Sequence, residues 1–300
     1  MFGREARGQR QVAKTSGRKH GFPLAPSLAP LAWPVGTISR RTVMNNAGLK
    51  AYCMNSLPQI LHTISYMALP LLFAMVLHEY AHGWVANQCG DPTAKLQGRL
   101  TMNPLAHIDR FGTVILPLLC LIMPGGFFLG WAKPVPIDPR RMRQPRRDMA
   151  LVAAAGPAMN LALAIGSALL FALLLSIDPT IGSYWSKSED TPSPDTWHVM
   201  FLLPIAVMSV YSVLINVLLM LFNLLPIPPL DGGRILTSLL PGTAAMALMR
   251  MEPYGMFILV ALIIFDPQIH VIHAITSTLT HSLSNSILST AVGLGTGDAP

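Results

Sequence analysis

The sequence has 300 residues, of which 52% are hydrophobic and only 12% are Asp, Glu, Lys or Arg. This charged share is about half that of typical soluble domains, which excludes an intrinsically disordered chain and an ordinary water-soluble globule. The net charge of +7 comes from residues 1–50, which hold nine basic residues and one acid. It therefore does not indicate a nucleic-acid-binding surface, and we expect no nucleic-acid partner. The three cysteines, Cys53, Cys89 and Cys120, are too scattered for a disulfide framework.

Residues 1–53 form a basic N-terminal arm. A basic stretch comes first and an apolar stretch follows, an order that resembles a signal sequence. Prolines interrupt the apolar stretch and make a helix there unfavourable; they are Pro23, Pro26, Pro30 and Pro34. We therefore expect a disordered arm, or a translation start at Met44 or Met54, rather than a signal peptide.

Three charge-free runs are long enough to cross a bilayer, which takes about 20 mostly apolar residues; they are 51–77, 149–177 and 199–230. The helical pattern of the first run continues past His78. The sequence thus predicts an all-α polytopic membrane protein in contact with the lipid bilayer. We expect a membrane-embedded core over residues 54–266. A C-terminal tail rich in apolar, Ser and Thr residues, 267–300, has a membrane placement that the sequence leaves open.

The most informative residues are His78, Glu79 and His82, which form an HExxH pattern near the end of the first apolar helix. The two histidines are four residues apart, so they share a helix face and can bind one metal ion. Glu79 lies beside them, where it can reach a water at the ion without binding the ion. Ionisable residues are costly in an apolar helix, so three within five positions favour a metal site over structural histidines.

A catalytic zinc usually takes three protein ligands and keeps one position open. The nearest downstream candidates for the third ligand are Asp91, His107 and Asp109. Asp231 is a better candidate because it is an isolated acid at the end of the apolar run 199–230. The prolines just before it cannot continue a helix, so the backbone is broken at membrane depth, where broken backbone is typical of a site.

With these residues in place, the chain resembles the site-2 protease family of intramembrane zinc metalloproteases. The HExxH pattern and Asn223–Gly232, which matches NxxPxPxxDG, carry the resemblance, and Ala155–Asn160 is similar to the family's AGPxxN segment. Gly90–Asp109 and Gly130–Pro134 look like its compact bacterial branch, and no polar run is long enough for a PDZ or CBS domain. The resemblance covers about residues 57–265 and implies a site-2-protease-like helical core.

The resemblance implies hydrolysis of peptide bonds in transmembrane protein substrates. It also implies one Zn²⁺ per chain, held by His78, His82 and Asp231. Glu79 would be the catalytic general base that takes a proton from the attacking water.

Asn160 and Asn223 are amide side chains in apolar helices, and by resemblance they bind the substrate backbone or stabilise the oxyanion. The alternative for each is an interhelical hydrogen bond. Two other functions stay open for the whole chain: a multipass ion or proton transporter, and an inactive protease-like scaffold. The intact HExxH and DG motifs disfavour the scaffold.

The metal ligands must meet at one depth in the membrane. Residues 149–177 and 199–230 cross and return, so 111–132 must add no net crossing and is predicted to be re-entrant. Residues 131–149 hold six basic residues and two acids, whereas 178–199 hold one basic residue and four acids. The positive-inside rule then places the zinc site toward the cytoplasmic side. We expect a multi-pass protein of the plasma (inner) membrane, with its oligomeric state left open.

Overall fold

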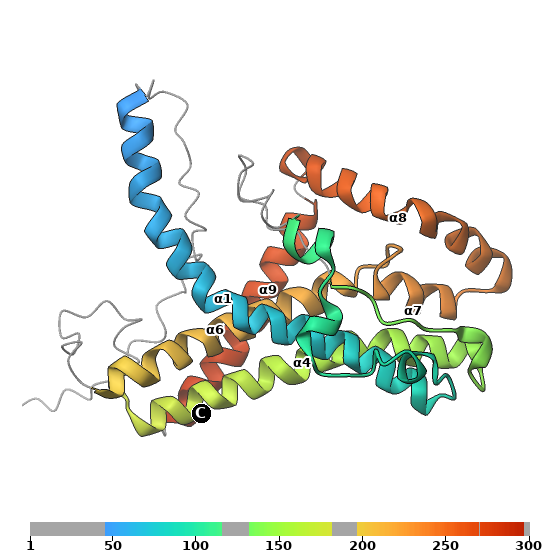
Figure 1. Ribbon diagram of the computed structural model, residues 1–300, viewed down its shortest axis with the longest axis horizontal. Helices are drawn as coiled ribbons and strands as arrows, with labels where there is room; N and C mark the ends of the chain where they lie inside the picture. The colour runs from blue at the N-terminus through green and yellow to red at the C-terminus, as the bar shows by residue number, and fades with distance from the viewer. Residues whose placement is uncertain (1–45, 116–131, 182–196, 270, 297–300) are drawn as a thin grey trace, which may run out of the picture.

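The computed structural model describes residues 46–115, 132–181, 197–269 and 271–296. Long helices dominate these residues, and no strand occurs among them. The long helices and α7 are α1 (Asn46–Gln88), α4 (Pro145–Ile177), α6 (Trp197–Asn223), α7 (Asp231–Leu239), α8 (Gly242–Ile269) and α9 (Val271–Thr296) (Figure 1). The short elements are α2 (Thr93–Leu96), η1 (Pro104–His107), η2 (Arg110–Ile115) and η3 (Pro139–Arg141).

Three of the described helices contain segments long and apolar enough to cross a membrane: Ile64–Gln88, Pro145–Ile177 and Met200–Asn223. They confirm the predicted all-α polytopic membrane protein. The predicted re-entrant segment, 111–132, lies mostly outside the described residues: its first five residues belong to the π-helical turn η2, and of the rest only Ala132 is described. Re-entry therefore stays a prediction, and most of the N-terminal arm also lies outside the described residues.

Helix α4 is the central helix and packs against α1, α6, α7 and α9. It begins with Pro145. The N–H of a first helical residue has no acceptor within the helix, so a proline at this position loses no hydrogen bond. The carboxylate of Asp148, one turn into the helix, accepts a hydrogen bond of 2.8 Å from the Gln144 amide, as in a capping box. These two residues start the helix at a defined point within the basic stretch Arg140–Arg147.

The hydrophobic core lies where α4, α6 and α9 meet. Small and β-branched side chains let these helices approach one another closely; they include Ala164, Ala168, Val213, Val217 and Ala291. At Gly295 of α9, a Cβ atom would lie 2.6 Å from the carbonyl oxygen of Ala172. Residues 271–296 of the C-terminal tail are therefore a helix packed into the same body as α4 and α6.

The chain between α6 and α7 turns sharply. Helix α6 ends at Asn223, before the three prolines that were predicted to stop it, and α7 begins at Asp231. A Cβ atom on Gly232 would collide with the carbonyl oxygen of Leu224, and one on Gly233 would lie 2.6 Å from a backbone nitrogen of the same turn. Only glycines allow this close approach of backbone to backbone, which fixes Asp231 at the start of α7.

Candidate metal centre

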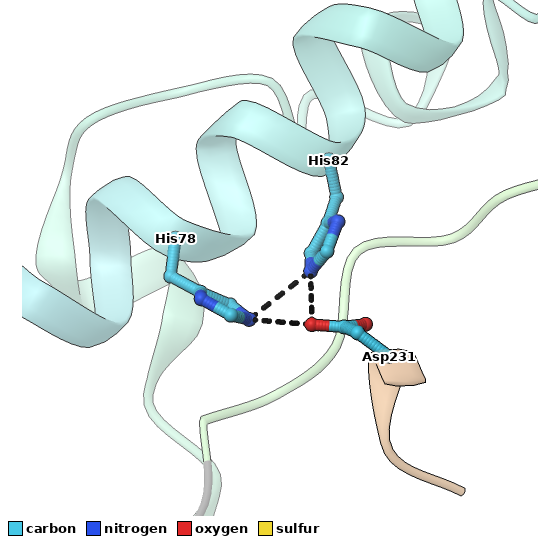
Figure 2. Close-up of side chains that lie close together, drawn as sticks. All are labelled: His78, His82 and Asp231. Atoms are coloured by element: carbon cyan, nitrogen blue, oxygen red, sulfur yellow. Dashed lines mark hydrogen bonds and ion pairs between the residues drawn. The ribbon is translucent and has the colours of Figure 1, made fainter. Parts of the chain in front are cut away.

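Two histidines of α1 and one aspartate of α7 converge on a single point (Figure 2). The Nε2 atoms of His78 and His82 lie 3.1 Å apart. They lie 3.2 and 3.3 Å, respectively, from Oδ2 of Asp231. All three residues are buried, with relative exposures of 8, 6 and 6%. Asp231 thus meets two histidines that precede it by 149 and 153 positions in the sequence.

The far nitrogen of each imidazole is held by helix α4. His78 Nδ1 donates a hydrogen bond of 2.9 Å to Oδ1 of Asn160, and His82 Nδ1 donates one of 2.7 Å to the carbonyl oxygen of Val152. A proton on Nδ1 leaves the Nε2 lone pair free, which is the tautomer that binds a metal. Helix α4 therefore sets both the orientation and the protonation of the two imidazoles.

The cluster fits a divalent metal ion. Oδ2 of Asp231 is buried and has no hydrogen-bond partner among the described residues. Two imidazoles and one carboxylate are a donor set used by catalytic zinc, and this is the metal-ligand cluster that the described residues form.

Gly156 of α4 makes room for the imidazoles. A Cβ atom at this position would lie 2.5 Å from His82 Nε2 and 2.5 Å from His78 Cε1. Any other residue would therefore displace the two rings or push α4 away from α1. The glycine is the second residue of the AGPxxN segment, but the sequence alone did not assign it a role at the metal.

Glu79 points to a different neighbour. Its Oε2 accepts a hydrogen bond of 2.9 Å from the backbone amide of Val135, in the extended segment before η3. The side chain is half-buried, next to His78 in the chain. One carboxylate oxygen is thus held by the protein, and the other is not engaged by any hydrogen bond described here.

The remaining predicted site residues lie in other surroundings. Asn223 donates from Nδ2 to the carbonyl oxygen of Leu219 at 2.9 Å, within its own helix rather than between helices. Asp91, His107 and Asp109, the alternative third ligands, are not part of the cluster. The carboxylate of Asp109 accepts hydrogen bonds from two backbone amides of η2. Asp91 accepts a hydrogen bond from the Asp138 amide, and His107 donates one to the carbonyl oxygen of Thr101.

The profile of Peptidase family M50 matches residues 66–265, which is 200 of the 300 residues. The chain belongs to peptidase family M50. The membership confirms the predicted relationship to site-2 proteases and identifies the chain as a membrane metalloprotease, a hydrolase of peptide bonds. The match ends before α9, which packs on the M50 core from outside the matched range.

Two relatives of this chain carry names that class them as zinc metalloproteases. YwhC of Bacillus subtilis is 36% identical over 206 residues, which cover 68% of this chain and 82% of YwhC. Rip2 of Mycolicibacterium smegmatis is 33% identical over 193 residues, which cover 64% of each chain. No solved structure gives a significant match to this chain.

The sequence did not identify two backbone groups of this chain that contact site residues. The Val152 carbonyl, which orients His82, and the Val135 amide, which contacts Glu79, carry no signal in a residue pattern. Every residue has a carbonyl and nearly every residue an amide, so only the fold selects these two. The interhelical hydrogen bond that the sequence offered as the alternative for Asn160 is present, between α4 and α1, but the sequence did not identify His78 as the partner.

Proposed function

We propose that this M50 chain is an intramembrane zinc endopeptidase that hydrolyses peptide bonds of transmembrane substrates. The observation that carries the proposal is the buried cluster of His78, His82 and Asp231. Its histidines lie in the C-terminal half of the span Ile64–Gln88, and Asp231 begins α7, eight residues after the span Met200–Asn223 ends. A hydrolase needs water at its metal, and broken backbone such as the turn between α6 and α7 is typical of places where a membrane-embedded protein forms a water-filled cavity.

The predicted zinc cofactor is confirmed by the cluster together with the relatives named as zinc metalloproteases. His78, His82 and Asp231 would hold the ion. When bound, Zn²⁺ acts as a Lewis acid that polarises a carbonyl group and lowers the pKa of a water toward neutrality.

Glu79 is the proposed general base. Glu79 follows His78 directly, in the turn of α1 that separates the two histidines, and one of its carboxylate oxygens accepts a hydrogen bond from the Val135 amide. The other oxygen would accept the proton of the attacking water and then deliver it to the leaving amine. A carboxylate that is already oriented loses little conformational freedom in this step.

Asn160 can serve both the imidazole and the substrate. Its Oδ1 accepts the proton of His78 Nδ1, and its Nδ2, fully buried, has no partner among the described residues. An unpaired buried N–H is costly, so a bound carbonyl oxygen would relieve that cost. We propose that Nδ2 donates to the substrate carbonyl, where it would stabilise developing negative charge. Asn223 is a second proposed substrate contact, through Oδ1, because its Nδ2 is used within α6.

The site is proposed to face the cytoplasmic side of the plasma (inner) membrane. Val152 and Gly156, which contact the imidazoles, lie in the first twelve residues of α4. The segment that precedes α4 is rich in arginine, and the loop after α4 is acidic. The positive-inside rule then puts the start of α4, and with it the metal, near the cytoplasmic face.

The test uses the full chain in liposomes of phosphatidylcholine and phosphatidylglycerol, with a co-reconstituted single-span model substrate. Zinc content and cleavage are measured for wild type and Glu79→Gln, with Glu252→Gln as control because Glu252 lies on α8 in an exposed ion pair with Arg234. We expect Glu79→Gln to keep its zinc and to lose cleavage by at least about 100-fold, since general-base catalysis contributes that much. Glu252→Gln should cleave as wild type does.

Three results would contradict the proposal. Zinc-loaded wild type that cleaves a soluble peptide but leaves the transmembrane substrate intact would remove the intramembrane part. Cleavage at the wild-type rate by Glu79→Gln would remove Glu79 as the base. Ion transport by wild type and mutant alike, without cleavage, would instead support the transporter.

A further inference from the structure

An extended segment, residues 132–138, runs past α1 beside the proposed general base. Pro134 and Pro136 have no amide hydrogen, so Val135 has the one backbone donor of these three residues. That donor is the group that binds Oε2 of Glu79 at 2.9 Å. Val135 is 6% exposed, so this residue is anchored in the protein interior. The two prolines therefore leave a single amide, placed at the base.

The guanidinium of Arg99 holds the same segment from the opposite side. Its Nη1 donates to the carbonyl oxygen of Ala106 at 2.5 Å, and its Nη2 donates to those of Lys133 and Pro134 at 2.9 and 3.3 Å. The Pro134 carbonyl and the Val135 amide belong to one planar peptide group. This one planar peptide group therefore accepts a hydrogen bond from the Arg99 guanidinium through its carbonyl oxygen, and it donates a hydrogen bond to Glu79 through its amide.

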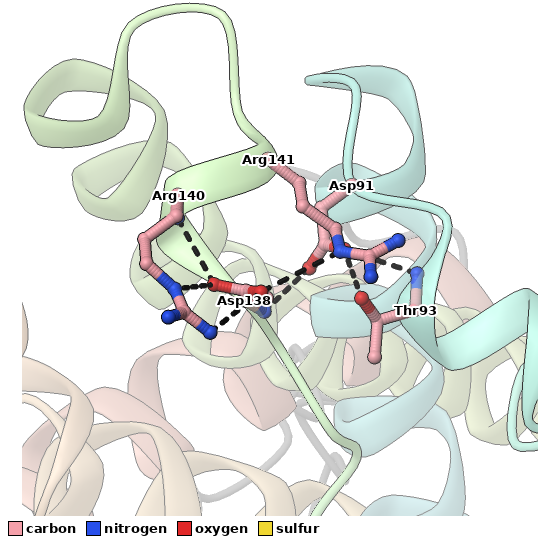
Figure 3. A network of polar contacts seen from close by, with 5 residues as sticks. All are labelled: Asp91, Thr93, Asp138, Arg140 and Arg141. Atoms are coloured by element: carbon pink, nitrogen blue, oxygen red, sulfur yellow. Dashed lines mark hydrogen bonds and ion pairs between the residues drawn. The ribbon is translucent and has the colours of Figure 1, made fainter.

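Both ends of the segment are fixed as well. The Lys133 amide donates to the His107 carbonyl oxygen at 2.8 Å, and the Asp138 amide donates to Oδ2 of the fully buried Asp91 at 2.7 Å (Figure 3). A hydrogen bond from Arg140 holds the pKa of the Asp138 carboxyl below its ordinary value. The segment is therefore held along its length, and Arg99 fixes the plane of its central peptide group.

We propose that Arg99 is a positioning residue for the general base Glu79 and acts through the peptide group between Pro134 and Val135. The proposal rests on the proposed function of Glu79. Glu79 has no ion pair among the described residues, so the Val135 amide is the donor that orients it. A cation on the carbonyl polarises the peptide group and strengthens the hydrogen bond that its amide donates. Oε2 is held in place, and the second oxygen is left for the proton of the attacking water.

This role predicts a defect in turnover rather than in metal or substrate binding. Arg99 contacts backbone carbonyls and none of the metal ligands. Its loss should leave zinc content and KM near the wild-type values. It should lower kcat by about 10- to 100-fold, the effect of misplacing a reacting group by about 1 Å.

The experiment compares Arg99→Ala and Arg99→Lys in the full chain with Arg140→Ala, whose arginine side chain is 89% exposed. Arg99→Lys keeps the charge but not the fork of donors, so it should retain part of the lost kcat. Added methylguanidinium should raise kcat for Arg99→Ala and leave Arg140→Ala unchanged. A backbone ester, introduced by α-hydroxyisovaleric acid at position 135, removes the amide hydrogen and keeps the side chain. The ester should lower kcat by a similar factor, and Arg99→Ala should add little in the ester background.

The ester decides the matter even where an Arg99 variant fails to fold. Wild-type kcat in the ester, or a kcat above that of wild type, would overturn the proposal, because the amide would then be irrelevant or a restraint. Loss of zinc, or a raised KM at unchanged kcat, in soluble Arg99→Ala would assign Arg99 to the scaffold instead. Zinc-loaded wild type that cleaves nothing would overturn the proposed function, whereas a cleaving wild type with a fully active ester would overturn this inference alone.

Discussion

At the scale of single residues, the candidate metal centre depends on a glycine, because there is no room for a side chain at that position. Gly156 faces both imidazoles, and a methyl group there would lie within 2.5 Å of ring atoms of His78 and His82. We predict that Gly156→Ala loses zinc affinity by at least about tenfold, as expected when metal ligands are misoriented. Gly166→Ala, on the same helix with open space around it, is the matched control and should bind zinc as wild type does. Zinc titration against a competing chelator measures both; equal affinities would show that α4 can shift without cost.

The residues of the His78–His82–Asp231 cluster, the proposed ligands, could be selected from the sequence because chemistry at a metal restricts residue type. Two histidines at i and i+4 share a helix face, and an isolated acid after a proline-broken helix has few structural explanations. Asn160 was identified as polar in an apolar helix, but its contact with His78 requires the packing of α1 on α4. Arg99 looks like an ordinary loop arginine, because its three acceptors are backbone carbonyls that only the fold brings together.

At the scale of elements, α7 is a short helix that must present Asp231 with little freedom. Its start is held by the turn after α6, and near its end Arg146 of α4 donates from Nε to the Ser238 carbonyl oxygen at 2.9 Å. We predict that Arg146→Gln weakens zinc binding by about fivefold, since a hydrogen bond at a partly exposed site contributes about 1 kcal/mol. The neighbouring Arg147 is exposed and carries the same charge, so Arg147→Gln should leave the zinc affinity unchanged. If the two variants bind zinc equally, α7 is held by its N-terminal turn alone.

The helices could be predicted where the local sequence constrains them strongly. Three long apolar runs can only be spans, and prolines end α6 where they were expected to. The tail was harder to place. Helix α9 carries serines and threonines between its apolar residues, so its hydropathy is ambiguous. What places α9 is the fit of small residues such as Ala291 and Gly295 against α4, which no composition reveals.

At the scale of the whole molecule, the metal centre connects α1 and α7, and α4 supports it from behind. A ligand that binds only the folded state stabilises it, by about 4 kcal/mol when present at a thousand times its Kd. We predict that removing zinc with a chelator lowers the melting temperature of the detergent-solubilised protein by about 5 °C or more. Added Zn²⁺ should restore it, whereas Mg²⁺, which prefers oxygen ligands, should not.

Two variants separate the metal's contribution to stability from its contribution to catalysis. Asp231→Ala lacks one ligand and should melt at nearly the same temperature with and without the chelator. Glu79→Gln keeps all three ligands and should show the full wild-type shift while being inactive. Such a pair of results would mean that the same ion that activates water also joins the helices of the core. An unchanged melting temperature of zinc-loaded wild type in the chelator would mean that packing of α1, α4 and α6 alone holds the site together.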